Sequence, residues 1–403
     1  MGQPCPAGII RDRVRRPTPV RPVDRQARPH HRHADGAARS RALLHCLDRP
    51  LKAVTPDLSP TLLLTGALPS PDWLGQAGRE VCVSSPGLRA MARQVRATQV
   101  SPAATEAIPE PGHERWLRQR FGLPDPYPFA ACGPAAAGCS QADWRIDPVH
   151  LHLGRDHLVL TDPERLALTG AESSALRAAA APLLAEEGLE LIECSPALWA
   201  LVHTDPNRPL DLRTHALTAA LGRSIDAYLP QGPDARRWRR ILNMVQMTWH
   251  IHPVNAQREA QGLPTVNGLW IEGPCPQADA GLSDARRQAA GALAKRIRHA
   301  PEGLRVDDGL SPLLVDDRFL QAQLTGDPQA FRSAWLKLDE QYFAAIARRE
   351  EPWAHGATVV LSGDSGWRSL SITPARAWSL SALWRRTDCS GWLNPIDPKR
   401  PPA

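Results

Sequence analysis

A stripe of large apolar side chains between Asp234 and Pro253 constrains the fold of this chain more than any other feature. The stripe consists of Trp238, Ile241, Leu242, Val245 and Trp249. Steps of three and four residues bring side chains to one face of an α-helix, and a proline ends a helix because it cannot donate the next hydrogen bond. The spacing predicts a helix from Asp234 to about residue 251, with one face buried in a core.

A second, polar stripe follows the same predicted helix. It consists of Arg239, Asn243, Gln246 and His250, and four further polar residues come after it: His252, Asn255, Arg258 and Asn267. We take these eight as the candidate ligand-binding residues, because amides and guanidinium groups can hold a phosphate or a carboxylate by directed hydrogen bonds. The alternative is a buried polar network without a ligand, in which the side chains satisfy one another. No catalytic residue is assigned.

The rest of the chain alternates strand and helix patterns, so the predicted fold class is α/β (mixed α+β), with sheet hairpins and packed helices. Thr169 and Glu172 form a capping box that opens a helix ending near Gly188. The other expected helices are 88–96, 113–121, 284–299, 311–324 and a helix capped by Asp327, and the expected strands are 149–153, 157–160, 189–194, 198–203, 265–272, 357–362 and 367–372.

The charge is concentrated at one end of the chain. The formal net charge is +6, but residues 1–50 contain 11 Arg, no Lys and 4 Asp, so the remaining residues sum to −1. An Arg/Pro-rich segment without hydrophobic periodicity predicts a disordered N-terminal arm. The expected segments are this arm (1–55), a poorly defined helical and loop region (56–140), an α/β core (141–275) and a helical segment with a C-terminal hairpin (276–403).

Several classes of protein are disfavoured. No apolar run is long enough to cross a bilayer, and no secretory signal is evident, so we expect a cytoplasmic protein without a membrane partner. Eight cysteines without a C-x-x-C pair suit a reducing compartment. A P-loop, G-x-G-x-x-G and H-E-x-x-H are absent. A basic arm alone gives only sequence-independent affinity for nucleic acid, so no specific nucleic-acid partner is expected.

Two local motifs invite catalytic interpretations that the context does not favour. The turn Gly363-Asp364-Ser365-Gly366 copies the nucleophile loop of chymotrypsin-like proteases, but a hairpin turn between two strands is favoured. His150 and His152 alternate on one strand, and His250 and His252 bracket a helix end. Paired histidines can bind metal, but ordinary hydrogen-bonded histidines are favoured in a chain with 14 His, and no metal site is assigned.

The polar region also carries a family resemblance. Asn243, Gln246 and Met247, then His252-Pro253-Val254-Asn255, Arg258-Glu259 and Pro264-x-Val266-Asn267-x-x-Trp270 resemble the RpfE-type regulatory proteins of proteobacteria, which are often labelled cofactor-independent phosphoglycerate mutase-like. The resemblance covers about residues 110–275 well and 300–380 loosely. Met244 stands where the family usually has Glu, and the family's apolar N-terminal strand is not found where the Arg/Pro arm stands.

The resemblance implies a regulatory or small-ligand-binding protein without a cofactor, whose partner is a small anionic ligand or another protein. The alternative that it implies is a phosphoglycerate mutase-like phosphotransferase, which would require a divalent metal ion. A third hypothesis assigns the polar residues to a structural network alone.

Overall fold

The structure is a computed structural model that describes residues 59–69, 85–101, 110–124, 127–154, 157–276, 281–296, 304–306, 311–373 and 392. All of them belong to one unit, residues 56–403. The predicted disordered arm, residues 1–55, lies outside the described residues. The fold class is mixed α/β, as the sequence predicted.

The larger sheet of the described chain has six strands in the order β2-β12-β11-β1-β10-β9. Its strands are β1 (Thr61–Leu68), β2 (Val95–Val100), β9 (Leu304–Val306), β10 (Leu313–Asp316), β11 (Ala357–Gly363) and β12 (Trp367–Ile372). β1 is parallel to both β10 and β11, while the outer strands are antiparallel. The carboxyl ends of three neighbouring strands therefore meet at one edge.

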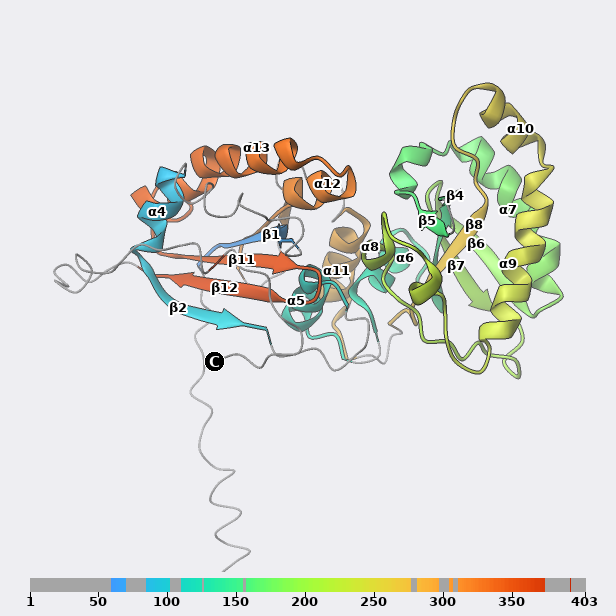
Figure 1. The fold of residues 1–403 in the computed structure, drawn as a ribbon. Coiled ribbons are helices and arrows are strands. Elements are labelled where there is room, and N and C mark those ends of the chain that lie inside the picture. The colour runs from blue at the N-terminus through green and yellow to red at the C-terminus, as the bar shows by residue number, and fades with distance from the viewer. Residues whose placement is uncertain are drawn as a thin grey trace, which may run out of the picture. The chain divides into compact units, whose positions relative to one another are not determined.

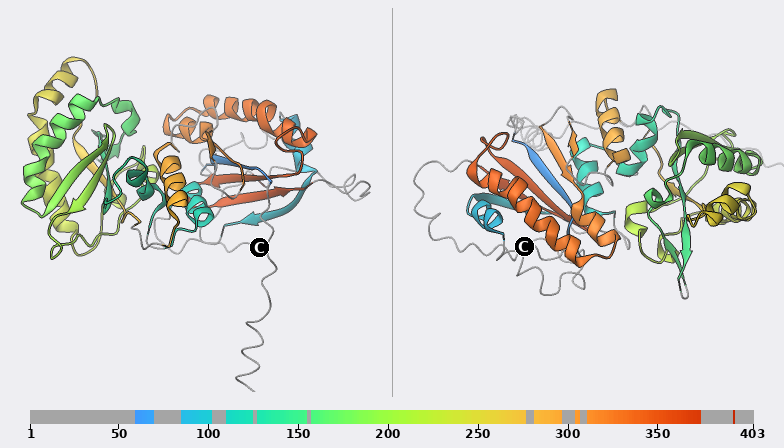
Figure 2. Two further views of the ribbon diagram at one scale, coloured as in Figure 1. Left: turned by 180° about the vertical axis from the view of Figure 1, so that it is seen from behind. Right: turned by 90° about the horizontal axis from the view of Figure 1, so that it is seen from above.

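Helices cover both faces of this sheet, which explains why β1 is a continuous apolar run. Leu62 and Leu64 belong to one core cluster and Leu63 to another, because successive side chains of a strand point to opposite faces. Figures 1 and 2 show α12 and α13 along one face. The helices of the first cluster are α4 (Pro86–Ala92), α12 (Arg318–Leu324), α13 (Pro328–Leu338), a π-helical turn (Asp339–Phe343) and α14 (Ala344–Arg348), and those of the second are α5 (Gly112–Phe121) and α11 (Asp284–Arg296).

The second sheet is antiparallel, in the order β6-β7-β3-β8. Its strands are β3 (Trp144–Val149), β6 (Leu189–Ser195), β7 (Leu198–His203) and β8 (Gly268–Glu272), and a separate hairpin joins β4 (Leu151–Leu153) to β5 (Leu158–Leu160). α7 (Gly170–Ala185) and α9 (Ala235–His250) share its core cluster, and α10 (Pro253–Ala260) follows α9. Short helical turns lie at Phe129–Cys132, α6 (Gly133–Ala136), Pro163–Leu166, α8 (Leu217–Ala220) and Asp226–Tyr228.

The strongest sequence signals are confirmed. Thr169 and Glu172 form the capping box at the start of α7, and Asp327 caps α13 through the amides of Gln329 and Ala330. The buried face of α9 carries Trp238, Ile241, Val245 and Trp249, each fully buried as predicted, whereas Leu242, the fifth residue of the predicted stripe, is only partly buried. These elements were predictable because capping and helical periodicity are local signals.

Two helix predictions were wrong. The segment 311–324 contains strand β10 followed by α12, because Leu313 and Val315 lie beside β1 in the sheet interior. The segment 88–96 contains the end of α4 and the start of β2, which pairs with β12. Short apolar runs buried by a sheet cannot be distinguished from helix by periodicity alone.

The family's apolar N-terminal strand was not found where the Arg/Pro arm stands, and the first described strand of this chain is β1, at Thr61–Leu68. All eight of its residues are buried, and it pairs with β10 and β11 near the middle of the sheet. The division of the chain into four segments stays a prediction. In the sequence, the strands of the six-stranded sheet lie both before and after residues 141–275.

The cysteine prediction also needs correction. Cys139 and Cys194 form a disulfide, with their Cα atoms 6.0 Å apart and a separation of 55 positions in the sequence. Cys132 and Cys275 are free and buried. Burial raises the pKa of the Cys132 thiol to about 12, so this thiol stays protonated at neutral pH. The pairing was not visible in the sequence because the two cysteines meet only through the tertiary fold.

No helix among the described residues is both long and apolar enough to span a bilayer.

Glu110, just before α5, predicts a pH dependence of stability. Burial raises its pKa to about 7, the nearby charge of Glu114 adds to the effect, and Arg118, whose Nε lies 3.0 Å from the carboxylate, opposes it. The folded state therefore binds the proton more tightly than the unfolded chain, whose carboxyl has a pKa near 4.5. The free energy of unfolding should fall between about pH 4.5 and 7, by about 2–3 kcal/mol.

Urea unfolding of the wild type and of Glu110→Gln between those pH values would test this dependence. The glutamine variant should lose most of the slope, because the amide does not titrate. An equal slope in both proteins would show that Glu110 is not the group responsible.

Candidate functional site

The polar stripe of α9 faces solvent because the opposite face of the helix is fixed in the core. Trp249 packs edge to face on Trp199, with ring centroids 6.0 Å apart, and its indole N–H donates to the carbonyl of Leu176 at 2.9 Å. Asn243, Gln246 and His250 are exposed, and no hydrogen bond within the described residues involves their side chains. Their bonding capacity is available to a ligand.

Asn255 fixes the connection between α9 and β8. Its Nδ2 donates to the carbonyls of Trp249 and Val266, each at 2.8 Å, and its Oδ1 accepts from the amide of Val266 at 2.9 Å. His252 begins α10, since its Nδ1 accepts from the amide of Val254 at 3.2 Å. Both residues therefore hold backbone in place.

Asn267 extends the strand pairing with its side chain. Its Oδ1 accepts from the amide of Leu151 at 2.6 Å, and its Nδ2 donates to the carbonyl of Leu151 at 3.0 Å. The amide thus reproduces the donor and acceptor pattern of a neighbouring strand and ties the β4–β5 hairpin to the entry of β8.

Arg258 is the most deeply buried of the candidate residues, with 1% of its side chain exposed. Its guanidinium donates to the carbonyl of Pro264 at 2.7 Å, to the carboxylate of Glu172 at 2.9 Å and to the carbonyl of Leu166. Arg258 joins α10 to the capping box of α7, and all three of its nitrogens are engaged in the fold.

These elements border an open cavity of about 420 Å³. Its lining residues are Asn243, Gln246, Met247, His250, Asn255, Glu259, Thr265 and Asn267. Arg239, His252 and Arg258 are not among them, so the structure brings together most, but not all, of the candidate residues. Arg239 donates from its Nε to the carbonyl of Ala235 at 3.3 Å on its own helix.

Three lining residues are not among the eight candidates: Met247 and Glu259, which the sequence indicated only through the family resemblance, and Thr265. Helical spacing could have predicted two of them. Met247 comes four residues after Asn243, and Glu259 comes four residues after Asn255, so each lies one helical turn from a candidate residue. Glu259 carries the only formal charge in the lining, and no Arg or Lys contributes to it. The site therefore offers amide donors and acceptors, an imidazole and one carboxylate.

A second group of polar residues, also missed in the sequence, lies where the three parallel strands end. Thr65, Asp316 and Ser362 are fully buried there. Ser362 Oγ donates to the carbonyl of Leu64 at 3.2 Å, and Arg318 Nε lies 3.0 and 3.1 Å from the two carboxylate oxygens of Asp316. α12 closes over this edge, where Gln323 Nε2 donates to the carbonyl of Gly66.

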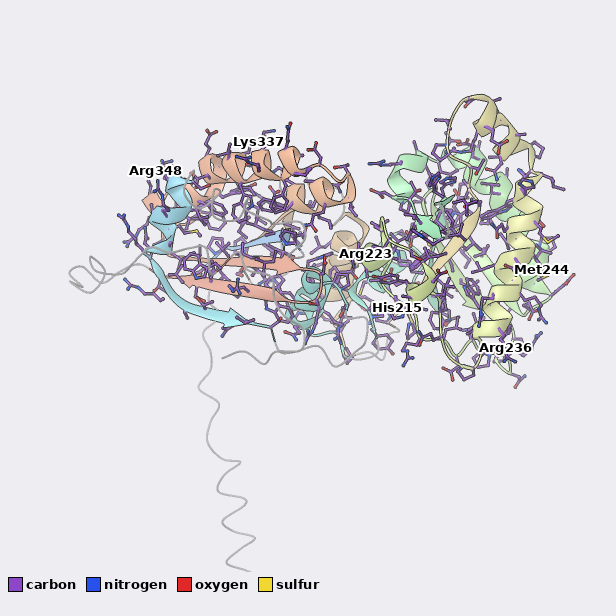
Figure 3. All side chains as sticks on the ribbon, viewed as in Figure 1. His215, Arg223, Arg236, Met244, Lys337 and Arg348 are labelled. Atoms are coloured by element: carbon purple, nitrogen blue, oxygen red, sulfur yellow. A yellow bond between two sulfur atoms is a disulfide. The ribbon has the colours of Figure 1, made fainter. Side chains whose placement is uncertain are left out.

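The hairpin turn 363–366 joins β11 to β12, as predicted. Gly363 donates to the carbonyl of Gly366 at 2.8 Å. Asp364 forms an ion pair with Arg223 at 3.0 Å, and Arg223 is labelled in Figure 3. The four-residue segment that resembles a protease nucleophile loop is therefore a hairpin turn.

No group of three or more His, Cys, Asp or Glu side chains within the described chain is arranged to hold a metal ion. His150 and His152 lie with ring centroids 6.3 Å apart, and His150 Nδ1 is 2.7 Å from the carbonyl of Thr265.

Comparisons with known proteins add a structural likeness. A scan against family models and a search of curated proteins find no match. Among solved structures, a cofactor-independent phosphoglycerate mutase from Thermoplasma acidophilum is 14% identical over 81% of this chain and 94% of its own, with a TM-score of 0.34. A protein from Pyrococcus horikoshii is 14% identical over 78% of this chain and 87% of its own, with a TM-score of 0.37. The RpfE-type resemblance stays a hypothesis.

The two kinds of amide in the site should respond differently to substitution. Asn267→Ala should lower the free energy of unfolding by about 1–2 kcal/mol, because both backbone groups of Leu151 lose a partner. Asn243→Leu should change it by less than about 0.5 kcal/mol, because Asn243 is exposed and makes no such bond. Chemical denaturation of both variants measures the difference. Equal losses would mean that Asn243 is also part of the structural network.

Proposed function

We propose that this chain is a small-ligand-binding protein of regulatory type, whose ligand occupies the cavity between α9, α10 and the entry to β8. The observation that carries the proposal is that Asn243, Gln246 and His250 line this cavity while their side chains bond to no other described residue. The RpfE-type regulatory role and a cytoplasmic location belong to the same proposal. The disulfide Cys139–Cys194 weighs against that location, because such bonds persist mainly in oxidising compartments.

The division of labour among the polar residues supports a binding site. Three of the polar side chains form hydrogen bonds within the fold, with backbone groups or with Glu172: Asn255, Asn267 and Arg258. These bonds fix the walls of the cavity. A site whose walls are already ordered loses less conformational entropy when a ligand binds. The three uncommitted side chains can then supply recognition.

The lining suits a small ligand with several oxygen acceptors. The amide nitrogens of Asn243 and Gln246 and the imidazole of His250 can each donate to a carboxylate or phosphate oxygen, and the amide oxygens can accept from ligand hydroxyls. Arg239 precedes Asn243 by one helical turn along the same exposed side of α9. A small anionic ligand with hydroxyl groups is therefore our preferred class.

Two anions of this kind provide a direct test. Titration with 3-phosphoglycerate, and separately with inorganic phosphate, should produce saturable NMR shifts of the His250 imidazole and of the Asn243 side-chain amide. Asn243→Ala combined with Gln246→Ala should abolish the shift of the His250 imidazole, whereas Gln329→Ala, which removes an exposed amide on α13, should not. If neither anion moves the wild-type signals, or the double variant keeps the His250 shift, the proposal fails for this ligand class.

The mutase-like alternative rests on a different observation, the polar residues at the carboxyl ends of β1, β10 and β11. Open parallel sheets often bind ligands outside such strand ends. The described residues do not fit a metal-dependent site there, because both carboxylate oxygens of Asp316 are taken by Arg318. Incubation with 3-phosphoglycerate and Mn²⁺, followed by ³¹P NMR for 2-phosphoglycerate, tests it. Turnover that survives the Asn243 and Gln246 double substitution would favour the mutase-like alternative over the binding protein.

A further inference from the structure

The exposed side of α9 and its C-cap residue form one continuous outer stripe, defined here as Arg236, Arg239, Asn243, Met247 and Ile251. At about 100° per residue these positions fall within roughly 60° of one line along the helix. The helix has 16 residues and is therefore about 24 Å long. Figure 3 labels Arg236 near its start and Met244 further along.

The C-terminal half of the outer stripe is apolar and exposed. Met247 is 73% exposed and Ile251 is 82% exposed, and they are one helical turn apart. Leu263, which follows α10, is 41% exposed. Single exposed apolar residues are ordinary, but neighbouring ones beside a cavity are typical of a surface that another molecule covers.

The N-terminal half of the outer stripe is basic and lacks an acidic partner. Arg237 and Arg240 pair with Glu187, whereas no ion pair within the described residues involves Arg236 or Arg239. The carboxylate at the start of α9, that of the N-cap residue Asp234, pairs with Arg237. An acidic group from another molecule could therefore pair with Arg236 and Arg239.

The opposite end of the same surface supplies such a group. Glu259 is exposed and lines the cavity together with Met247 and His250, so it lies near the C-terminal half of α9. The C-terminus of α9 is also the negative end of its dipole. The surface is therefore basic at one end, apolar in its centre and acidic at the other.

We propose that two copies of this chain associate through their outer stripes, with the two α9 helices antiparallel about a two-fold axis near Met247. A two-fold axis presents the same patch on both copies, so the Arg239 end of each copy faces the Glu259 end of the other. Met247 and Ile251 form the dry centre, and the charges form the rim. Each copy then covers the cavity of the other. Its Arg239 lies beside that cavity, whose lining contains no Arg or Lys.

Sedimentation velocity of the full chain, from about 1 to 100 μM, tests the association. The wild type should dimerise in this range. Met247→Glu with Ile251→Glu should weaken association at least tenfold, while Leu336→Glu should not, since Leu336 is an equally apolar residue, 49% exposed, on α13. A monomeric wild type at the highest concentration overturns the proposal, as does a dimer that the double variant leaves unchanged.

A charge exchange tests the antiparallel arrangement. Arg239→Glu and Glu259→Arg should each weaken association about tenfold, because each places like charges opposite one another. A chain that carries both substitutions should associate as the wild type does, because opposite charges then face one another again in both symmetry-related contacts. Far-UV circular dichroism spectra equal to that of the wild type confirm that each variant is folded. Failure of the double exchange to restore the dimer contradicts the proposed pairing. The pairing does not depend on the proposed ligand.

Discussion

Gly112→Ala is expected to lower the free energy of unfolding by about 3 kcal/mol, the upper end of the usual cost of overpacking. A Cβ atom at this position would lie 1.9 Å from the carbonyl oxygen of Gly366 and 2.8 Å from that of Gly363. The first of these oxygens accepts the hydrogen bond of the hairpin turn, so it cannot move without loss of that bond. The first turn of α5 must therefore separate from the turn between β11 and β12.

Gly170→Ala is the matched control for this prediction. Gly170 also occupies the first position of a helix, but the nearest atom to its added Cβ is the Cγ of Pro196, at 4.0 Å. This variant should be as stable as the wild type or slightly more stable, because alanine restricts the unfolded chain. Thermal and urea unfolding of both variants measure the contrast, and a stable Gly112→Ala protein would show that the contact between α5 and the hairpin is not obligatory.

Arg258→Met is expected to cost about 3–5 kcal/mol, the range for removal of one partner from a buried ion pair. Methionine fills a similar volume but leaves the carbonyls of Pro264 and Leu166 without their donor, and Glu172 loses its cation. The change therefore loosens α10 and the capping box of α7 together. Since Glu172 remains partly exposed, water recovers part of the loss on that side.

The control for Arg258 is Arg236→Met, which removes an arginine whose side chain is exposed on α9. It should leave the free energy of unfolding within about 0.5 kcal/mol of the wild type. Denaturation curves of the two variants, with circular dichroism to confirm folding, measure the difference. A structural role alone predicts a large decrease in the free energy of unfolding for Arg258→Met. A small decrease would therefore favour a ligand-binding role for Arg258.

The sequence was most informative where structure depends on neighbouring residues. Helical periodicity located α9, and capping located α7 and α13. The position of β10 could not be predicted, because its burial comes from β1, which lies far away in the sequence. The same holds for the disulfide between Cys139 and Cys194.

The candidate site shows the same limit. Residue type identified Asn243, Asn255 and Asn267 equally, yet the structure gives them different surroundings. Asn255 and Asn267 each bond to backbone on another element, whereas Asn243 is exposed beside the cavity. An amide can satisfy a backbone or a ligand with the same atoms, so composition alone could not separate these roles.

The placement of β1 has a consequence for how the protein is made. Contacts at its carboxyl end join residues 251 and 298 positions apart, Thr65 with Asp316 and Leu64 with Ser362. At ordinary rates of translation, the ribosome needs about 15–60 s to extend the chain over the longer interval. During that time a strand of eight residues that are all buried in the native sheet has emerged without its parallel neighbours. Synthesis thus exposes an aggregation-prone apolar segment early, and completion of the sheet must wait for the last part of the chain.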